Sequence, residues 1–263
     1  VIYKGGYVAD DQRADFSNPV IAWKDTLNLG LATFKRGVAT LRLRAIDGSS
    51  QDKIFLRNIT QILDLDFSPS GNNMVLSAIS GGRTDIFTLN MRGQGRRLTN
   101  DVFDDITPVF LNDSTIIYAS YFTDLPDSVL TRTPDVSQVP GYYNLFKIQV
   151  GDSIVVDRLT NVDHKNYRPR VLNQSTILHL SEQSGIMNIM RFGLGSAVSS
   201  QISAINKSLE TFDYSLSSNQ WAYAVRDGHQ SKLVLEPFTN LDQFTMSTPR
   251  IQIRQAKKLS ERL

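Results

Sequence analysis

The residue types that carry out hydrolytic chemistry are present in this chain, but not at the spacings that such chemistry needs. A zinc metallopeptidase places two histidines one helical turn apart with a glutamate base between them, whereas His164, His179 and His229 are scattered along the sequence. The Gly-x-Ser-x-Gly string of many serine hydrolases does not occur. The count of zero cysteines excludes thiol catalysis and cysteine-ligated zinc. We therefore predict no catalytic residues and no metal site in this chain.

Phosphate groups and nucleic acids are not indicated as ligands either. The glycine motifs that cradle phosphates are absent, and we interpret Gly93-Gln-Gly95 as a hairpin turn. Arg92, Arg96 and Arg97 lie close together, but 28 basic against 26 acidic residues give a formal net charge of only +2. Domains that bind nucleic acid usually carry a basic stripe. We expect a solvated arginine rim, with no cofactor and no nucleic acid as partner.

The acidic segment Asp64–Gly71 places two carboxylates at alternate positions, an arrangement that can wrap a calcium ion. A calcium loop needs further acidic oxygens and a bidentate glutamate, and neither follows here. Alternation in an extended strand puts Asp64 and Asp66 on one face. We therefore interpret both as polar strand residues that face a central channel or a neighbouring repeat.

The positions of these side chains follow from a repeated pattern of short strands. The clearest copy begins with two apolar segments within Ile62–Ala78, joined by the turn Ser68–Asn72, which contains Pro and Gly. Two further strands are expected at Arg83–Asn90 and Arg97–Asn100. A large residue precedes the first turn of each copy, and the intervals between these anchors are 44, 43, 61 and 43 residues. The anchors are Trp23, Phe67, Phe110, Val171 and Tyr214.

A second marker gives the same period. An aliphatic residue that closes each copy recurs at intervals of 42, 61 and 43 residues, at Leu56, Leu98, Leu159 and Ile202. The long interval is explained by an insertion over residues 121–141, which is rich in Asp, Pro, Ser and Thr. Four strands in every 42 to 44 residues predict an all-β fold, a β-propeller of four-stranded antiparallel blades. A β-sandwich or barrel is the alternative, but neither requires so regular a recurrence.

Five blades are visible, and they could close alone or form part of a six-bladed ring. We assign residues 1–249 to the propeller, and residues 250–263 to its last strand and an amphipathic tail. Helical spacing of the apolar tail residues predicts a short C-terminal helix that packs on the rim, or else associates peripherally with a membrane or partner. The chain begins without a start Met, so we expect a processed or excised piece. No apolar run approaches the roughly 20 residues of a transmembrane segment.

Three short motifs carry a resemblance to a known family. Phe67–Gly71, Thr84–Phe87 and Leu98–Asn100 resemble the TolB-like repeats, also called PD40 or WD40-like, of bacterial envelope propellers. The longer strings Pro19–Gly30 and Leu98–Asp105 are similar to the propeller region of long TolB-like envelope proteins of the Bacteroidota, in which a metallopeptidase-like domain often precedes the propeller. The resemblance implies a location in the periplasm or at the cell surface, associated with the outer membrane, and protein partners of the cell envelope.

Two features of the sequence are candidates for binding such partners. Loops that link one blade to the next gather at the mouth of a propeller, and loops on a rigid scaffold often carry function. Two such loops contain Asp101, Asp104 and Asp105, and Asp163, His164 and Lys165, and together we expect them to form a surface for a partner or a cation. The insertion contributes apolar side chains, namely Leu125, Val129 and Leu130, and we expect it to fold over one face as part of a protein contact.

These observations favour a non-catalytic propeller that acts as a protein interaction scaffold in the cell envelope, within a larger complex or multidomain protein. The alternative is a propeller that supports or gates a peptidase whose catalytic residues lie outside this chain, as a resemblance to prolyl-oligopeptidase-type propellers would allow. Fold alone does not distinguish the two, because function lies in sites that are grafted onto folds.

Overall fold

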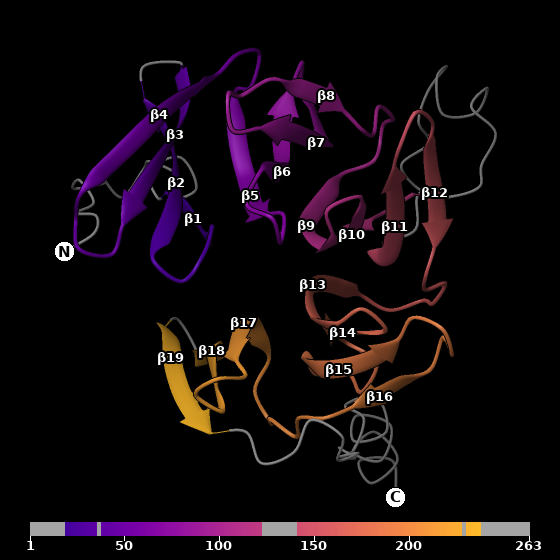
Figure 1. Cartoon of the computed structure of the whole chain (residues 1–263). Helices are drawn as coiled ribbons and strands as arrows, with labels where there is room; N and C mark the ends of the chain where they lie inside the picture. Colours follow the sequence, from indigo (N-terminus) through magenta and orange to yellow (C-terminus); the bar gives the residue numbers. More distant parts are fainter. Residues whose placement is uncertain (1–18, 36–37, 123–140, 228–229, 238–263) are drawn as a thin grey trace, which may run out of the picture. The chain divides into compact units, whose positions relative to one another are not determined.

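The computed structural model describes residues 19–35, 38–122, 141–227 and 230–237, and every regular element in these ranges is a β-strand (Figure 1). The strands form five antiparallel sheets, in each of which neighbouring strands are consecutive in the chain. This meander is the topology of a propeller blade, so we number the sheets as blades 1 to 5. The described residues include no helix that is long and apolar enough to cross a membrane. The expected C-terminal helix and tail lie outside the described residues.

Blade 1 consists of β1 (Val20–Trp23), β2 (Asn28–Lys35), β3 (Val38–Ala45) and β4 (Ser50–Leu56). Blade 2 consists of β5 (Gln61–Phe67), β6 (Asn73–Ser80), β7 (Arg83–Asn90) and β8 (Gly95–Arg97). Blade 3 consists of β9 (Asp105–Asn112), β10 (Thr115–Ser120), β11 (Asn144–Val150) and β12 (Ile154–Arg158). Blade 4 consists of β13 (Asn166–Asn173), β14 (Thr176–Ser181), β15 (Asn188–Gly193) and β16 (Ser199–Gln201). Blade 5 has three described strands, β17 (Leu209–Ser215), β18 (Gln220–Asp227) and β19 (Gln230–Pro237).

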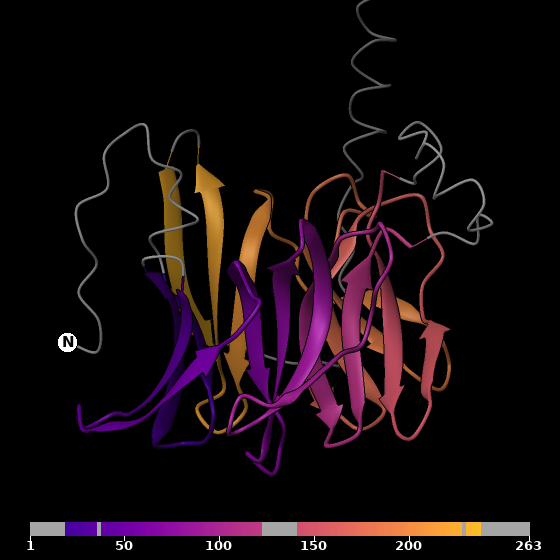
Figure 2. The same cartoon turned by 90° about the horizontal axis from the view of Figure 1, so that it is seen from above.

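The chain divides into two compact units. The first unit contains blades 1 and 2 and nearly all of blade 3, and the second contains residues 141–145 and blades 4 and 5. Within the first unit, the first strands of successive blades are neighbours, because β5 contacts both β1 and β9. Figure 2 shows the strands of blades 2 and 3 standing side by side in purple and magenta. The insertion predicted at residues 121–141 falls between β10 and β11, inside blade 3.

Packing between blades explains why their middle strands are apolar on both faces. On β6, Met74 and Leu76 belong to the core between blades 1 and 2, whereas Val75 belongs to the core between blades 2 and 3. Side chains that alternate along a strand point to opposite faces of the sheet, so blade 2 buries apolar surface against both blade 1 and blade 3. A third core joins blades 4 and 5 in the second unit and includes Phe212 and Trp221.

All five sequence anchors lie in the first strand of a blade, in β1, β5, β9, β13 and β17. Phe67 shows what such an anchor does. The backbone of Gly30 on β2 lies so close to the Phe67 ring that a Cβ atom at position 30 would come within 2.5 Å of it. A glycine in a strand interior often marks such a close approach, and here it admits a buried aromatic ring from the next blade.

The last strand of blade 2 differs from the prediction. The sequence predicted Arg97–Asn100, whereas β8 spans Gly95–Arg97. Beyond Arg97, two hydrogen bonds still join this segment to β7. One connects two backbone groups, and the other has a side-chain hydroxyl as its acceptor. The N–H of Leu98 donates to the carbonyl of Ile86, and the N–H of Ile86 donates to the Thr99 hydroxyl at 3.0 Å. The hydroxyl replaces a backbone carbonyl, so the regular strand ends at Arg97, three residues before the predicted end at Asn100.

The same closure occurs in blades 3 and 4. The N–H of Leu145 donates to the hydroxyl of Thr160 at 2.8 Å, and the N–H of Ile189 donates to that of Ser203 at 2.9 Å. We call Thr99, Thr160 and Ser203 the closing hydroxyls. Each follows the aliphatic marker that recurs in the sequence. In blade 1, that marker is Leu56, and Arg57 stands where the other three blades have the hydroxyl.

Candidate functional site

The first candidate loop, between β8 and β9, contains a cluster of three carboxylates from blades 2 and 3. Its deepest member is Asp85 on β7, which is completely buried. The Asp85 carboxylate accepts a hydrogen bond from the Arg97 guanidinium, and the two side chains form an ion pair. The other oxygen of Asp85 lies 3.5 Å from the Thr99 hydroxyl. Burial raises the pKa of Asp85, and the Arg97 guanidinium opposes this shift. Asp85 could not be predicted from the sequence as part of this cluster, because it lies in the preceding hairpin.

Asp101 and Asp105 complete the cluster, and they are held differently. Asp101 accepts a hydrogen bond from the N–H of Phe103 at 2.9 Å, which fixes the turn, and burial raises its pKa. Asp105 at the start of β9 is only 1% exposed. Burial, together with the negative charge of Asp101, raises the pKa of Asp105 to about 8. A carboxyl group with this pKa is mostly protonated at neutral pH.

Two of these carboxylates hold the loop, since Asp85 binds Arg97 and Asp101 accepts a hydrogen bond from the N–H of Phe103. Within the described ranges, no group of three or more His, Cys, Asp or Glu side chains is arranged to hold a metal ion. Asp105 was predicted to contribute to a partner surface, but the structure buries it, because its strand begins inside the packing between blades 2 and 3. Asp104 is exposed and is therefore the carboxylate of this loop that can reach a partner.

The second candidate loop lies in the second unit, before β13. The Asp163 side chain is fully exposed, and one of its carboxylate oxygens lies 3.6 Å from Nδ1 of His164. Lys165 places its ammonium group 4.5 Å from the centre of the Tyr167 ring and 5.6 Å from that of Tyr143. Its positive charge is thus held by aromatic faces. This loop presents charges of both signs next to two tyrosine rings.

Leu125, Val129 and Leu130 lie outside the described residues. The two charged loops belong to different units, so their sharing of one surface remains a prediction.

The two aspartates considered as calcium ligands have a structural role. The carboxylate of Asp66 accepts a hydrogen bond from the N–H of Phe110 at 2.8 Å, and that of Asp64 accepts one from the N–H of Thr107 at 3.3 Å. Both bonds run from β5 to the first strand of blade 3. Of the two interpretations that the sequence left open, contact with the neighbouring blade is therefore the correct one.

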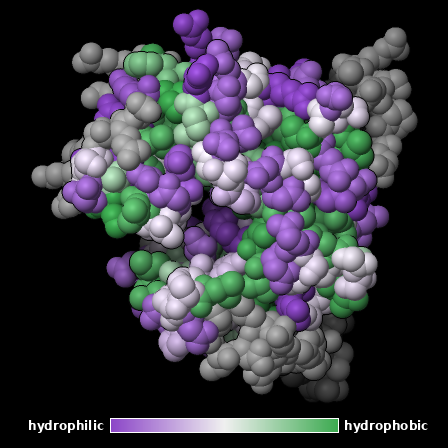
Figure 3. Space-filling model, in the orientation of Figure 1, coloured by the Kyte–Doolittle hydropathy of each residue, from purple (hydrophilic) through white to green (hydrophobic). Residues whose placement is uncertain are grey.

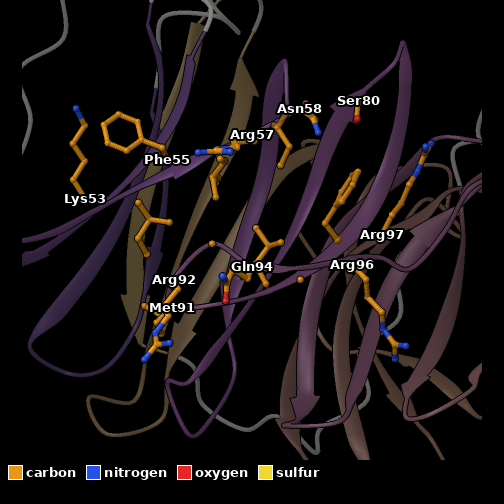
Figure 4. Close-up of a pocket in the computed structure, with 17 residues that line it drawn as sticks. Lys53, Phe55, Arg57, Asn58, Ser80, Met91, Arg92, Gln94, Arg96 and Arg97 are labelled. Carbon is orange, nitrogen blue, oxygen red and sulfur yellow. The ribbon is translucent and has the colours of Figure 1, made fainter.

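A groove that was not predicted from the sequence lies in the first unit, between the outer strands of blades 1 and 2. It has a volume of about 960 Å³ and is lined by the end of β4, the residues that follow it, and the β7–β8 hairpin. Figure 4 shows Lys53 and Phe55 on the β4 side, and Arg96 and Arg97 on the β8 side. In the space-filling view, hydrophilic side chains gather over the loop between β4 and β5 (Figure 3).

Comparison with known proteins identifies the fold. No family model and no curated protein matches the sequence. Among solved structures, a protein assigned as TolB from Agrobacterium tumefaciens is 17% identical with a TM-score of 0.60, over 83% of this chain and 76% of that one. TolB from Acinetobacter baumannii is 18% identical with a TM-score of 0.58, over 83% and 51%. Prolyl oligopeptidase B from Galerina marginata is 12% identical with a TM-score of 0.55, over 86% and 32%.

These similarities, together with the blade topology, show that the chain has a β-propeller fold. More particularly, its fold is similar to that of the two TolB structures. The chain spans about half of the Acinetobacter structure and about a third of the prolyl oligopeptidase. At these identities the comparison establishes the fold and leaves the activity to be argued from the sites.

Proposed function

We propose that this chain is a non-catalytic β-propeller that serves as a protein interaction scaffold in the bacterial cell envelope, in the periplasm or at the cell surface. The similarity to TolB structures supports this function. The observation that carries it is the construction of the loop between blades 2 and 3. Buried Asp85 binds Arg97 at the start of that loop, and Asp101 fixes its turn by accepting a hydrogen bond from the N–H of Phe103, while Asp104 is exposed. Rigidly supported loops with exposed charges are typical of interaction surfaces.

The second unit offers an equivalent surface. The Asp163 side chain is exposed, and Lys165 is held against Tyr143 and Tyr167. Aromatic side chains next to charged groups are enriched in protein interfaces. We propose that Asp104, Asp163, His164 and Lys165 contact protein partners, and that the insertion with Leu125, Val129 and Leu130 adds an apolar contact.

The test begins with the tagged chain and an envelope extract of the source bacterium. A partner that is captured in stoichiometric amount would be identified by mass spectrometry, purified and titrated against the chain. Asp104→Lys and Asp163→Lys should each weaken this binding at least fivefold. Asp152→Lys is the matched control, because Asp152 is exposed in the β11–β12 turn, at the opposite end of blade 3 from Asp104. Equal affinity for all four proteins would exclude the two loops as the binding surface.

A peptidase-linked propeller is the second candidate, and the similarity to prolyl oligopeptidase B favours it. In that case, the catalytic residues would lie outside this chain. Peptide hydrolysis by the full-length gene product, abolished by mutation of a domain outside residues 1–263, would support this function. A full-length protein without hydrolytic activity that still binds its partner would support the scaffold.

A further inference from the structure

We propose that the groove between β4 and β8 is a second binding surface, which takes an acidic protein segment in an extended conformation. The groove lies wholly within the first unit and is separate from the two charged loops. The inference rests on the charge of the lining, the free strand edges beside it, and the residue types that the chain places there. It does not depend on which partner binds the loops.

The charge of the groove is strongly one-sided. Its lining contains five cationic side chains and no aspartate or glutamate. The five cations are Lys53, Arg57, Arg92, Arg96 and Arg97. Such a cluster in a concave surface attracts anionic groups and raises their local concentration.

Most of these charges have no anionic partner in the described part of the chain. Arg97 is the exception, because it is paired with buried Asp85. Arg96 donates to the backbone carbonyl of Gly151 at 2.6 Å, which positions its guanidinium without neutralising it. Lys53 lies 4.5 Å from the centre of the Phe55 ring. Arg57 and Arg92 are exposed and form no ion pair with a described residue. The groove therefore has unneutralised positive charge on both of its sides.

Edge strands of two blades border the groove. β4 is the last strand of the first sheet and β8 is the last strand of the second sheet; among the described strands, β4 pairs only with β3 and β8 only with β7. An extended peptide can add to such an edge through main-chain hydrogen bonds, while pockets for alternate side chains provide specificity. The exposed ring of Phe55, at 57% exposure, provides an apolar contact at the same place.

The residue types in the groove also differ from those at the equivalent positions of other blades. Thr99, Thr160 and Ser203 follow the closing aliphatic residue in blades 2, 3 and 4, and each of these hydroxyls completes its own blade. In blade 1 that position is Arg57, an exposed side chain that lines the groove. Blade 1 thus places a cation where the other three use a structural hydroxyl.

A peptide fits these observations better than a nucleic acid does. The formal net charge of the whole chain is only +2, whereas nucleic-acid-binding domains usually carry an extended basic surface. Free strand edges and an apolar ring are features that recognise a peptide backbone with alternating side chains. Nucleic acid and anionic lipid are therefore competing outcomes of the test.

The test measures fluorescence anisotropy with a labelled ten-residue peptide in which Glu alternates with Val and Phe, added to the full chain. Matched probes are a peptide with Lys in place of Glu, one with Pro in place of Val, a ten-nucleotide oligo-dT and phosphatidylglycerol vesicles. We expect the acidic peptide to bind at least tenfold more tightly than each of the others, and more weakly at 0.5 M salt than at 0.05 M salt. Equal binding of oligo-dT or vesicles would overturn the proposal, as would equal binding of the Lys peptide.

Variants locate the binding. The double variant Arg57→Ala/Arg92→Ala should weaken binding of the acidic peptide roughly five- to tenfold, since each lost ionic contact at an exposed surface contributes modestly. The control Arg226→Ala/Lys232→Ala removes the same charge from exposed positions in the second unit and should bind like the unmodified chain. Circular dichroism confirms that each variant is folded. Equal loss in both double variants would show an effect of net charge and exclude the groove.

Discussion

The carboxylate of Asp66 accepts a hydrogen bond from the backbone N–H of Phe110, and these two residues are 44 positions apart in the chain. The same separation, within one residue, recurs in other contacts between neighbouring blades. The N–H of Ser70 donates to Asp113 across 43 residues, and the hydroxyl of Tyr167 donates to the carbonyl of Glu210 across 43 residues. The period found in the sequence is therefore also the spacing of the hydrogen bonds that join successive blades.

The Asp66 bond should contribute measurably to stability. We expect Asp66→Ala to lower the free energy of unfolding by about 1–3 kcal/mol, because it leaves the partly buried N–H of Phe110 without this acceptor. Urea denaturation followed by tryptophan fluorescence measures the change. Asp152→Ala, at an exposed turn, is the control and should change stability by less than about 0.5 kcal/mol. A similar small effect at position 66 would show that this bond does not stabilise the contact between blades.

Asp105 should make the stability of the protein depend on pH. Its pKa is raised to about 8 in the fold, so between pH 4 and 8 the folded state binds more protons at this site than the unfolded state does. The free energy of unfolding should consequently fall as pH rises through this range, by at most about 1.4 kcal/mol per pH unit for this one group. Urea denaturation at pH 5, 6.5 and 8 measures the slope.

Asp105→Asn tests the assignment of that slope, because an amide resembles the protonated carboxyl and cannot ionise. We expect the variant to lose most of the decline and to be more stable than the unmodified chain at pH 8. Asp104→Asn, at the exposed neighbour, should leave the slope unchanged. An undiminished slope in Asp105→Asn would assign the pH dependence to other groups, of which Asp85 and Asp101 are the nearest.

Gly30 should tolerate no side chain. A Cβ at this position would lie 2.5 Å from the Phe67 ring and 3.2 Å from Leu65, so the buried ring would have to move. We expect Gly30→Ala to lower the thermal midpoint of unfolding, at a cost of about 1–3 kcal/mol, as overpacked cores usually do. Gly195→Ala is the control, since a Cβ there would meet nothing within 4 Å. A thermal midpoint for Gly30→Ala equal to that of the control would contradict the close approach.

The closing hydroxyls should be replaceable by one another but not by an apolar side chain. In Thr160→Val the N–H of Leu145 loses its acceptor, and we expect a loss of about 1–2 kcal/mol in the free energy of unfolding. Thr160→Ser keeps the hydroxyl, as Ser203 does in blade 4, and should lose less than half as much. Chemical denaturation of the two variants decides between a role of the hydroxyl and a role of side-chain volume.

The fold could be predicted from the sequence because the period depends on residues that every blade needs. Each anchor lies in the first strand of its blade, and the anchors Phe67 and Phe110 and the closing residues Leu56, Leu98 and Ile202 are buried. The end of β8 could not be predicted, because it depends on the Thr99 hydroxyl taking the place of a carbonyl, which requires knowledge of the pairing with Ile86.

The candidate sites were harder to predict, because their members come from different parts of the chain. Asp105 was expected at a surface, and its burial follows from packing between two blades that a linear pattern does not show. The groove was not predicted because Arg57 and Arg92 are 35 residues apart in the sequence and are associated with different sheets. One signal was available in the repeat. When the residues that follow the closing aliphatic residues are aligned, Arg57 stands at the position that Thr99, Thr160 and Ser203 occupy in the other blades.

The closing hydroxyls also bear on how such a protein changes in evolution. Thr99, Thr160 and Ser203 each bond within the blade that contains them, so the polar chemistry that finishes a blade is carried by that blade's own segment of chain. Duplication of a segment of about 43 residues would copy these hydrogen bonds together with the apolar faces of the blade. Gain or loss of an entire blade would therefore require adjustment only where the new neighbours meet.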